Sequence, residues 1–302
     1  MERGSILVIG SANMDMIVKS ATLPKPGETV IGGTFSMVPG GKGANQAVAA
    51  ARLGGPVCFL TCLGDDEFGQ SLRATYEREG IDTRLLQTIE GSHTGIAFIL
   101  VDGAGENMIS VASGANACFT PDRLGGLDRL EIRPECVLLQ LEIPLDTVAA
   151  AADWAKRRGA KVILDPAPSP AGGLSNEILS SVDILTPNEV EAAALAGREV
   201  RSFEDAIEAG KSLVERSSCS AIITLGDRGG VYVSASENWT YSTPRVEAID
   251  STAAGDCFAG ALALGLAEGK SVREAVGFAA RAAAFSVTRM GAQSSLPRRE
   301  DL

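Results

Sequence analysis

An aspartate preceded by small residues is the first candidate for chemistry in this chain. Asp256 follows Ala253, Ala254 and Gly255, and the Ala-, Leu- and Gly-rich stretch after it is typical of a buried helix. Unpaired N–H groups and the helix dipole at a helix N-terminus favour an anion such as a transferring phosphoryl group. Asp256 could take the proton of a hydroxyl that attacks this group, or it could simply cap the helix.

A second glycine-rich segment reads PGGKGANQ. It is not a P-loop, because the G-x-x-x-x-G-K spacing is absent and no Ser or Thr follows the lysine. It is not a dinucleotide fingerprint either, because Gln46 stands where a third glycine belongs. The segment instead predicts a permissive backbone that presents polar side chains to a hydroxyl-rich ligand, or an isolated turn. The residues in question are Gly41, Lys42, Gly43 and Asn45.

Polar residues also follow the predicted strands. Asn13 and Asp15 come directly after the first apolar run, and Glu142 ends a later one. Ligands collect at the carboxyl ends of parallel strands, and alternation points Asn13 and Asp15 to the same side. With Lys42 and Asn45 they offer donors and charged acceptors but no aromatic platform, which favours a polyol over a nucleobase. Each of them alone could equally be an ordinary surface residue.

Two further segments suit a nucleotide and its metal. Asn188 and Glu191 begin a helix after a Pro-broken turn, and their i, i+3 spacing could organise Mg²⁺ through its water shell. Helix capping by Asn188 is the alternative. A later loop could wrap a nucleotide with its backbone or form an ordinary hairpin turn; it consists of Thr224, Leu225, Gly226, Asp227, Arg228 and Gly229.

Composition excludes several classes of protein. The 302 residues carry a formal net charge of −11, which works against binding to nucleic acid. The only histidine is His93, which removes most Ser-His-Asp, Cys-His and His-ligated metal schemes. The six cysteines form no CxxC pair and are expected to be reduced packing residues. Without an apolar run of about 20 residues or a secretory leader, the protein is expected in the cytoplasm.

Short apolar runs alternate with helical patterns along most of the chain. They are too continuous for half-exposed strands and predict buried parallel strands at residues 6–9, 57–63, 137–141, 162–164, 184–186 and 222–225. The apolar spacing of covering helices is found at residues 68–79, 145–158 and 203–216. The fold class that follows is α/β, with a doubly wound, mostly parallel sheet flanked by helices in a single domain.

Two stretches depart from this pattern. Residues 14–38 and 94–112 alternate with a period closer to two and contain turn signals such as Pro26-Gly27 and Asp102-Gly103. Both predict small antiparallel excursions, which could form a β-sheet lid over the ligand crevice. A last strand is predicted at residues 246–250, just before the loop that leads to Asp256.

These segments occur together in one known family. Over nearly its full length the chain resembles the carbohydrate kinases of the phosphofructokinase-B type, and within them the ribokinase branch. The resemblance rests on GGKGANQAVAAARLG at 40–54, DSTAAGDCFAGAL at 250–262, GSANMD at 10–15, TPNEVE at 186–191, TLGDRGG at 224–230 and VTRMGAQSS at 287–295. Ala253 stands where many members of the wider family have glycine, which favours that branch.

The resemblance implies a ribokinase-like fold and transfer of phosphate from ATP to O5 of D-ribose. Asp256 would be the catalytic base, with Ala253, Ala254 and Gly255 as the anion hole. The sugar would be held by Asn13, Asp15, Gly41, Lys42, Gly43, Asn45, Glu142 and Asp256. ATP would contact Asn188, Thr224, Leu225, Gly226, Asp227, Arg228, Gly229, Gly255 and Ala280. Mg²⁺ would lie at Asn188 and Glu191, and an activating K⁺ at Asp250, Thr252, Ser286, Arg289, Gly291 and Ser295.

Two alternatives to a ribose kinase stay open at this point. One is a kinase for another small acceptor, such as deoxyribose, a ketose or adenosine; the other is a sugar-binding regulator without catalysis. Adenosine would need an apolar or aromatic base pocket, and an intact Asp256 argues against the regulator. The exposed edges of a lid sheet, together with the family, predict a homodimer formed through the lid.

Overall fold

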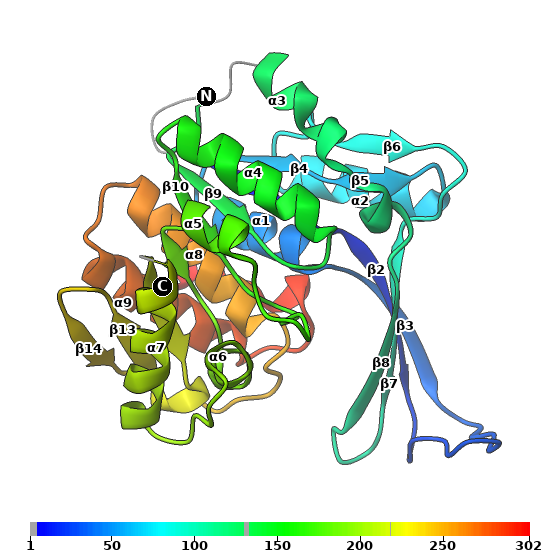
Figure 1. Ribbon diagram of the computed structural model, residues 1–302. Coiled ribbons are helices and arrows are strands. Elements are labelled where there is room, and N and C mark those ends of the chain that lie inside the picture. The colour runs from blue at the N-terminus through cyan, green and yellow to red at the C-terminus, as the bar shows by residue number, and fades with distance from the viewer. Residues whose placement is uncertain (1–4, 130–132, 218) are drawn as a thin grey trace.

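A computed structural model describes residues 5–129, 133–217 and 219–302 (Figure 1). Its main element is an eight-stranded sheet in the order β14-β13-β12-β11-β10-β9-β1-β4. These strands are β1 (Ile6–Ile9), β4 (Val57–Leu60), β9 (Cys136–Leu139), β10 (Lys161–Leu164), β11 (Ile184–Leu185), β12 (Ser220–Thr224), β13 (Gly230–Val233) and β14 (Asn238–Tyr241). From β12 to β4 all neighbours are parallel, and β13 and β14 add an antiparallel edge. The predicted mostly parallel sheet is confirmed.

Helices cover both faces of this sheet. They are α1 (Lys42–Arg52), α2 (Glu67–Arg78), α3 (Gly126–Arg129), α4 (Leu145–Arg157), α5 (Asn176–Ser181), α6 (Glu189–Ala196), α7 (Phe203–Ser217), α8 (Ala254–Ala267) and α9 (Val272–Ser286). Alternate residues of β1 belong to two hydrophobic cores, one on each face of the sheet. Ile6 and Val8 pack with α1, α8 and α9, whereas Leu7 and Ile9 pack with α4 and α5. Burial on both faces explains why the strands read as continuous apolar runs. None of the helices in the described ranges is long and apolar enough to cross a membrane.

One predicted strand is divided. The sequence predicts a single strand over residues 57–63, whereas β4 ends at Leu60 and β5 spans Cys62–Gly64. The partner strand β1 ends at the same level, because Ile9 pairs with Leu60, and the N–H group of Gly10 donates to the carbonyl of Leu60 at 3.2 Å. The chain then changes partners, and β5 pairs in parallel with β6 (Gln87–Ile89) in a separate two-stranded sheet.

A smaller sheet of four strands extends away from the body of the molecule (Figure 1). The hairpins β2 (Asn13–Lys19) with β3 (Thr34–Gly40) and β7 (Gly95–Val101) with β8 (Asn107–Ala112) are each antiparallel, and β2 and β7 join them in parallel. Strand β2 follows the carboxyl end of β1 closely, so the start of the small sheet lies at the edge where ligands collect. That this sheet closes over a ligand as a lid stays a prediction.

The prediction of a strand at residues 246–250 is wrong. The segment has no regular structure, and Val246 and Ile249 are 43% and 60% exposed. The N–H groups of Ile249 and Asp250 both donate to the carbonyl oxygen of Val287, at the end of α9, rather than to a strand. After β14 ends at Tyr241, the chain runs to the end of α9 instead of pairing with another strand.

Candidate active site

Helix α8 begins with an N-terminus that no side chain caps. Its N-cap residue, Ala253, has φ 60° and is the only non-glycine residue with positive φ in the part of the chain that the structure describes. This left-handed conformation costs an alanine about 1 kcal/mol. Within the described ranges no acceptor meets the N–H groups of Gly255 and Asp256, and both residues border a small pocket. The helix start is therefore available to an anion.

Asp256 is a buried carboxylate held by α1 rather than the cap of its own helix. Its Oδ2 accepts from Asn45 Nδ2 at 2.9 Å, and its Oδ1 accepts from Gln46 Nε2 at 3.2 Å. The two helices can approach this closely because Gly260 has no side chain; a Cβ there would lie 2.7 Å from the carbonyl oxygen of Gln46. The capping alternative for Asp256 is therefore wrong.

Asp165 is a second buried carboxylate at this site, and no sequence-based expectation includes it. It directly follows β10, its Oδ2 accepts from Gln46 Nε2 at 2.9 Å, and Lys42 Nζ lies 4.0 Å from the same oxygen. The signal that points to Glu142, an acidic residue at the end of a buried strand, applies equally to Asp165. Gln46 itself carries no such signal, because only the fold brings it to the two carboxylates.

Burial and neighbouring charges perturb this cluster. Burial raises the pKa of Asp256, although Lys42 and the amides of Asn45 and Gln46 oppose the change. Burial also raises the pKa of Asp165, again against the attraction of Lys42. Burial disfavours the Lys42 ammonium, but Asp165 and Asp256 outweigh it and raise the pKa of the lysine. An aspartate with a raised pKa is a stronger base, which suits removal of a proton from a hydroxyl.

Two acidic residues expected to hold a polyol lie near Asp256. Glu142 Oε2 accepts from Ser11 Oγ at 2.5 Å and from the Lys42 N–H at 3.0 Å, so it closes the N-terminus of α1. Asp15 is 9% exposed, and burial, helped by the charges of Glu142 and Asp256, raises its pKa to about 7. A carboxylate in this state is poorly solvated and gains from hydroxyl donors on a ligand.

The amide of Asn13 has a defined orientation. Asn116 Oδ1 accepts from the Ala12 N–H at 3.0 Å, and Asn116 Nδ2 donates to the Ala12 carbonyl at 3.2 Å and to Asn13 Oδ1 at 2.8 Å. A peptide N–H only donates and a peptide oxygen only accepts, so Ala12 determines how Asn116 is turned, and Asn116 determines how Asn13 is turned. Nδ2 of Asn13 is left to donate to a ligand. No local signal in the sequence identifies Asn116.

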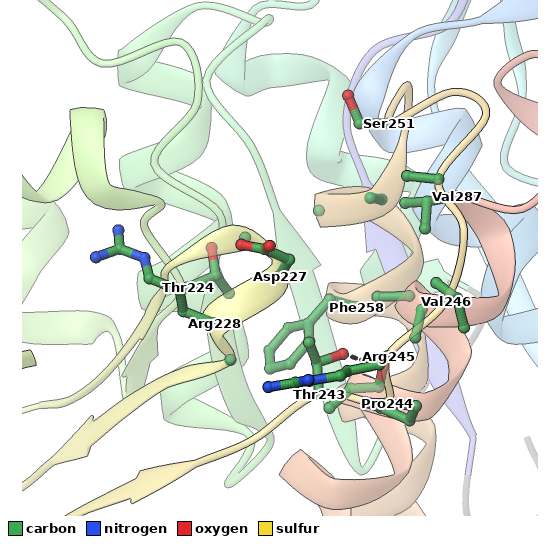
Figure 2. A pocket seen from close by; sticks show the side chains of 18 of the residues that line it. Thr224, Asp227, Arg228, Thr243, Pro244, Arg245, Val246, Ser251, Phe258 and Val287 are labelled. Carbon is green, nitrogen blue, oxygen red and sulfur yellow. Dashed lines mark hydrogen bonds between the residues drawn. The ribbon is translucent and has the colours of Figure 1, made fainter.

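A pocket of about 620 Å³ opens beside the start of α8 (Figure 2). Phe258, Val246 and Val287 contribute apolar wall, and the loop between β12 and β13 faces them with Thr224 and Asp227 (Figure 2). The loop is a hairpin connection, as one alternative held, and it also lines the pocket. Of the residues expected at a nucleotide, those that line it are Thr224, Gly226, Asp227, Arg228, Gly229, Gly255 and Ala280. Leu225 is buried and does not line it.

A smaller pocket of about 210 Å³ adjoins the first, sharing Thr224 and Gly255 with it. Asn188 and Glu191 border it and form a capping box, in which each backbone N–H donates to the other residue's side chain at 2.9 Å. The capping alternative for Asn188 is confirmed. Lys42 and Asp165 also border this pocket, where the ammonium lies 4.0 Å from Oδ2 of the carboxylate.

Comparison with known proteins identifies the class of enzyme. A family model for the pfkB family carbohydrate kinases matches residues 3–299. The chain belongs to this family. It is 42% identical to the ribokinase of Haemophilus influenzae, over 99% of this chain and 97% of that one. A ribokinase structure from Thermotoga maritima has a TM-score of 0.89 and 41% identity, covering 98% and 97% of the two chains. The Arabidopsis thaliana ribokinase complexed with ribose and ATP has a TM-score of 0.91 and 35% identity, covering 99% and 97%.

The residues that the family resemblance assigns to K⁺ lie on two segments joined by Asp250. Its Oδ1 accepts from the N–H and Oγ1 of Thr252 at 2.9 and 2.6 Å, and its Oδ2 accepts from the Gly291 N–H at 2.8 Å. Burial opposes ionisation, but these bonds hold the pKa of Asp250 below its usual value. Ser286 and Ser295 each donate to a carbonyl of their own turn, and Arg289 pairs with Asp301 at 3.6 Å.

Proposed function

We propose that the protein transfers the γ-phosphoryl group of ATP to the primary 5-hydroxyl of D-ribose, giving D-ribose 5-phosphate and ADP. The observation that carries the proposal is the position of Asp256, a buried carboxylate at an uncapped helix N-terminus that borders both the smaller pocket and the polar side chains of α1. The sugar is supported by the similarity to ribokinases, one of which has been solved with ribose and ATP.

The sugar would be recognised by a combination of hydrogen-bond donors and hydrogen-bond acceptors. Asn13 Nδ2 donates and Asp15 accepts from the same face of β2, while Asn45 Oδ1 is a buried acceptor with no partner among the described residues. Glycines let the binding loop press against the start of β2: a Cβ at Gly41 would lie 2.8 Å from the backbone nitrogen of Asn13. Such preorganised groups orient a small polyol at little entropic cost.

The chemical step would be an in-line displacement. The 5-hydroxyl oxygen forms a bond to the γ-phosphorus and its proton passes to Asp256, while the bond to the β,γ-bridging oxygen breaks and its electron pair leaves with ADP. The N–H groups at the start of α8 and the Lys42 ammonium would stabilise charge on the transferring group, each contributing on the order of several kcal/mol. Closure of the small sheet would exclude water.

Metal ions complete the proposal. ATP would enter as its magnesium complex, and the side-chain oxygens of Asn188 and Glu191, which border the smaller pocket, match the ligands that Mg²⁺ prefers. K⁺ would bind at the ionised Asp250, whose carboxylate oxygens and the neighbouring Thr252 hydroxyl suit a hard cation. A cation there would stabilise the turn that leads from Asp250 to Ala253. Because this turn precedes α8, the cation would also stabilise the anion site at the start of that helix.

We further propose that the protein is a cytoplasmic homodimer. The face of the small sheet that includes Met16 carries Phe35, Met37, Phe98 and Met108, which are 61%, 50%, 52% and 55% exposed. A second copy of the same sheet would cover this apolar face and the free edges of β3 and β8. Use of ATP and six cysteines that form no disulfide support a reducing, cytoplasmic location.

The test is ADP release, coupled to an optical assay, with ribose, deoxyribose, fructose, 2-keto-3-deoxygluconate and adenosine as acceptors. Each acceptor is assayed with K⁺ and with Na⁺. We expect the highest kcat/KM with ribose and activation by K⁺. Preference for another acceptor would be consistent with the kinase chemistry but would overturn the assignment of ribose as the substrate. No ADP release with any acceptor would favour a non-catalytic sugar-binding protein.

A further inference from the structure

Gln46 lies at the centre of the buried polar network and has no part in the proposal above. Its side chain is fully buried, and its Nε2 donates to two carboxylates, Asp165 at 2.9 Å and Asp256 at 3.2 Å. Its Oε1 accepts from Nε2 of Gln140 at 2.6 Å. Gln140 is itself fully buried and follows β9, so the network links α1, α8 and the ends of two central strands.

The orientation of each amide in this network follows from its partners. An ionised carboxylate only accepts, so the Gln46 atom that faces Asp165 and Asp256 must be the nitrogen, and both of its hydrogens are used. The oxygen of Gln46 must then face Gln140, which has to present its nitrogen. A Cβ at Gly10 would lie 1.8 Å from Gln140 Oε1, so the missing side chain at Gly10 makes room for this arrangement.

Gln46 therefore acts on the catalytic aspartate without reaching the substrate. We propose that Gln46 is a positioning residue that clamps Asp256 through a hydrogen bond to Oδ1 and so holds its carboxylate in place to accept a proton. Asn45 holds Oδ2 and Gln46 holds Oδ1, and the neighbouring pair restricts rotation of the carboxylate. The inference rests on the proposed function for its catalytic part, whereas the clamp itself is a property of the folded chain.

The surrounding charges explain why a neutral donor matters here. Asp256 is faced by Lys42 from α1, by Glu142 and Asp165 from the ends of β9 and β10, and by Asp15 from β2. Glu191 from α6 adds its charge at Lys42 and Asp165. One lysine thus lies among five carboxylates, of which Asp165 and Asp256 are the most buried. A shared N–H₂ group adds one charge-assisted hydrogen bond to each of them and adds no charge. Without this donor, the repulsion between Asp165 and Asp256 is reduced most easily when one of them binds a proton. A protonated Asp256 could not act as the base.

The kinetic experiment compares Gln46→Met with the wild type. Methionine fills the same volume but donates no hydrogen bond. We expect kcat to fall about 10- to 100-fold, the loss of a hydrogen bond to a charged group, with the KM values for ribose and ATP changed by less than about threefold. The acid limb of the pH profile of kcat should move upward by about one pH unit, because Asp256 then holds its proton more tightly.

Two other variants separate positioning from general destabilisation. Gln140→Met removes only the anchor of Gln46 and should lower kcat and shift the acid limb in the same direction by smaller amounts; it decides the question if Gln46→Met does not fold. Thr147→Val deletes a buried hydrogen bond to the Phe119 carbonyl, far along the chain in α4, and should leave kcat per folded molecule and the acid limb unchanged.

A second readout needs no sugar. Loss of the shared donor raises the folded-state pKa of the aspartates further, so the unfolding penalty of Gln46→Met should increase as the pH rises through that pKa. Urea unfolding at about pH 5 and about pH 9 measures this difference. A penalty equal at both pH values would overturn the clamp. A pH-dependent penalty with normal kcat and a normal acid limb would overturn its catalytic role, and wild-type inactivity toward ribose would instead refute the proposed function.

Discussion

Replacement of Asp15 by Asn should stabilise the protein while weakening its sugar site. Burial and the charges of Glu142 and Asp256 raise the pKa of Asp15 from 3.8 to about 7. A folded-state pKa above the unfolded value means that ionisation opposes folding, so stability is lost as the pH rises between these values and stays low above them. The shift is about three units, and each unit corresponds to about 1.4 kcal/mol, which gives about 4 kcal/mol at alkaline pH. Burial of the neutral amide cancels part of this, and we expect a net gain of about 2 kcal/mol.

The assay is urea unfolding of both proteins without ligands at about pH 4, pH 6 and pH 9. Because the amide cost of about 2 kcal/mol applies at every pH, the variant should be less stable than the wild type by about 1 to 2 kcal/mol at the lowest pH. It should be more stable by about 1 kcal/mol at the second pH and by about 2 kcal/mol at the third. Asp153→Asn is the matched control, because Asp153 is half-exposed and forms an ion pair with Arg157 one turn away. This substitution should change stability by less than about 0.5 kcal/mol at every pH. An Asp15→Asn protein that is no more stable than the wild type at alkaline pH would refute the reasoning.

Three other substitutions test separate parts of the account. Ala253→Gly should raise the free energy of unfolding by about 0.5 kcal/mol, since glycine adopts positive φ without strain but loses more chain entropy; a loss of stability in urea unfolding would contradict this. Asn116→Asp removes the donor that orients Asn13 and should raise the KM for ribose about tenfold with the KM for ATP unchanged, so equal effects on both would count against orientation. Phe98→Asp places a charge on the exposed face of the small sheet and should convert a dimer into a monomer in light scattering; a monomeric wild type or a dimeric variant would remove the proposed interface.

Local patterns suffice for those parts of the site that strand ends and helix starts define. Asn13, Asp15 and Glu142 are found by the rule that ligands collect at the carboxyl ends of parallel strands, and Asp256 by the small residues before an apolar helix. The sheet itself follows from continuous apolar runs, because burial on both faces leaves no alternation to confuse with an exposed strand.

The rest depends on pairing between distant segments. Gln46 meets Asp256 across 210 residues and Gln140 across 94, and Asn116 meets Ala12 across 104, so no window of sequence contains these contacts. The predicted strand at residues 246–250 fails for the same reason: the segment hydrogen-bonds to the carbonyl of Val287 at the end of α9, a contact that no local window of sequence contains. A capping residue and a catalytic residue at a helix start also have the same local sequence pattern. Only three-dimensional contacts show that Asn188 caps its helix and that Asp256 does not.

The most direct test of the central claim is ribose-dependent ADP release by Asp256→Asn, measured beside ribose binding by calorimetry. We expect a Kd for ribose within about threefold of the wild type and a kcat reduced by about 10² to 10⁴, the usual contribution of a general base. Near-normal turnover in a variant that folds and binds ribose would contradict the assignment of Asp256 as the base.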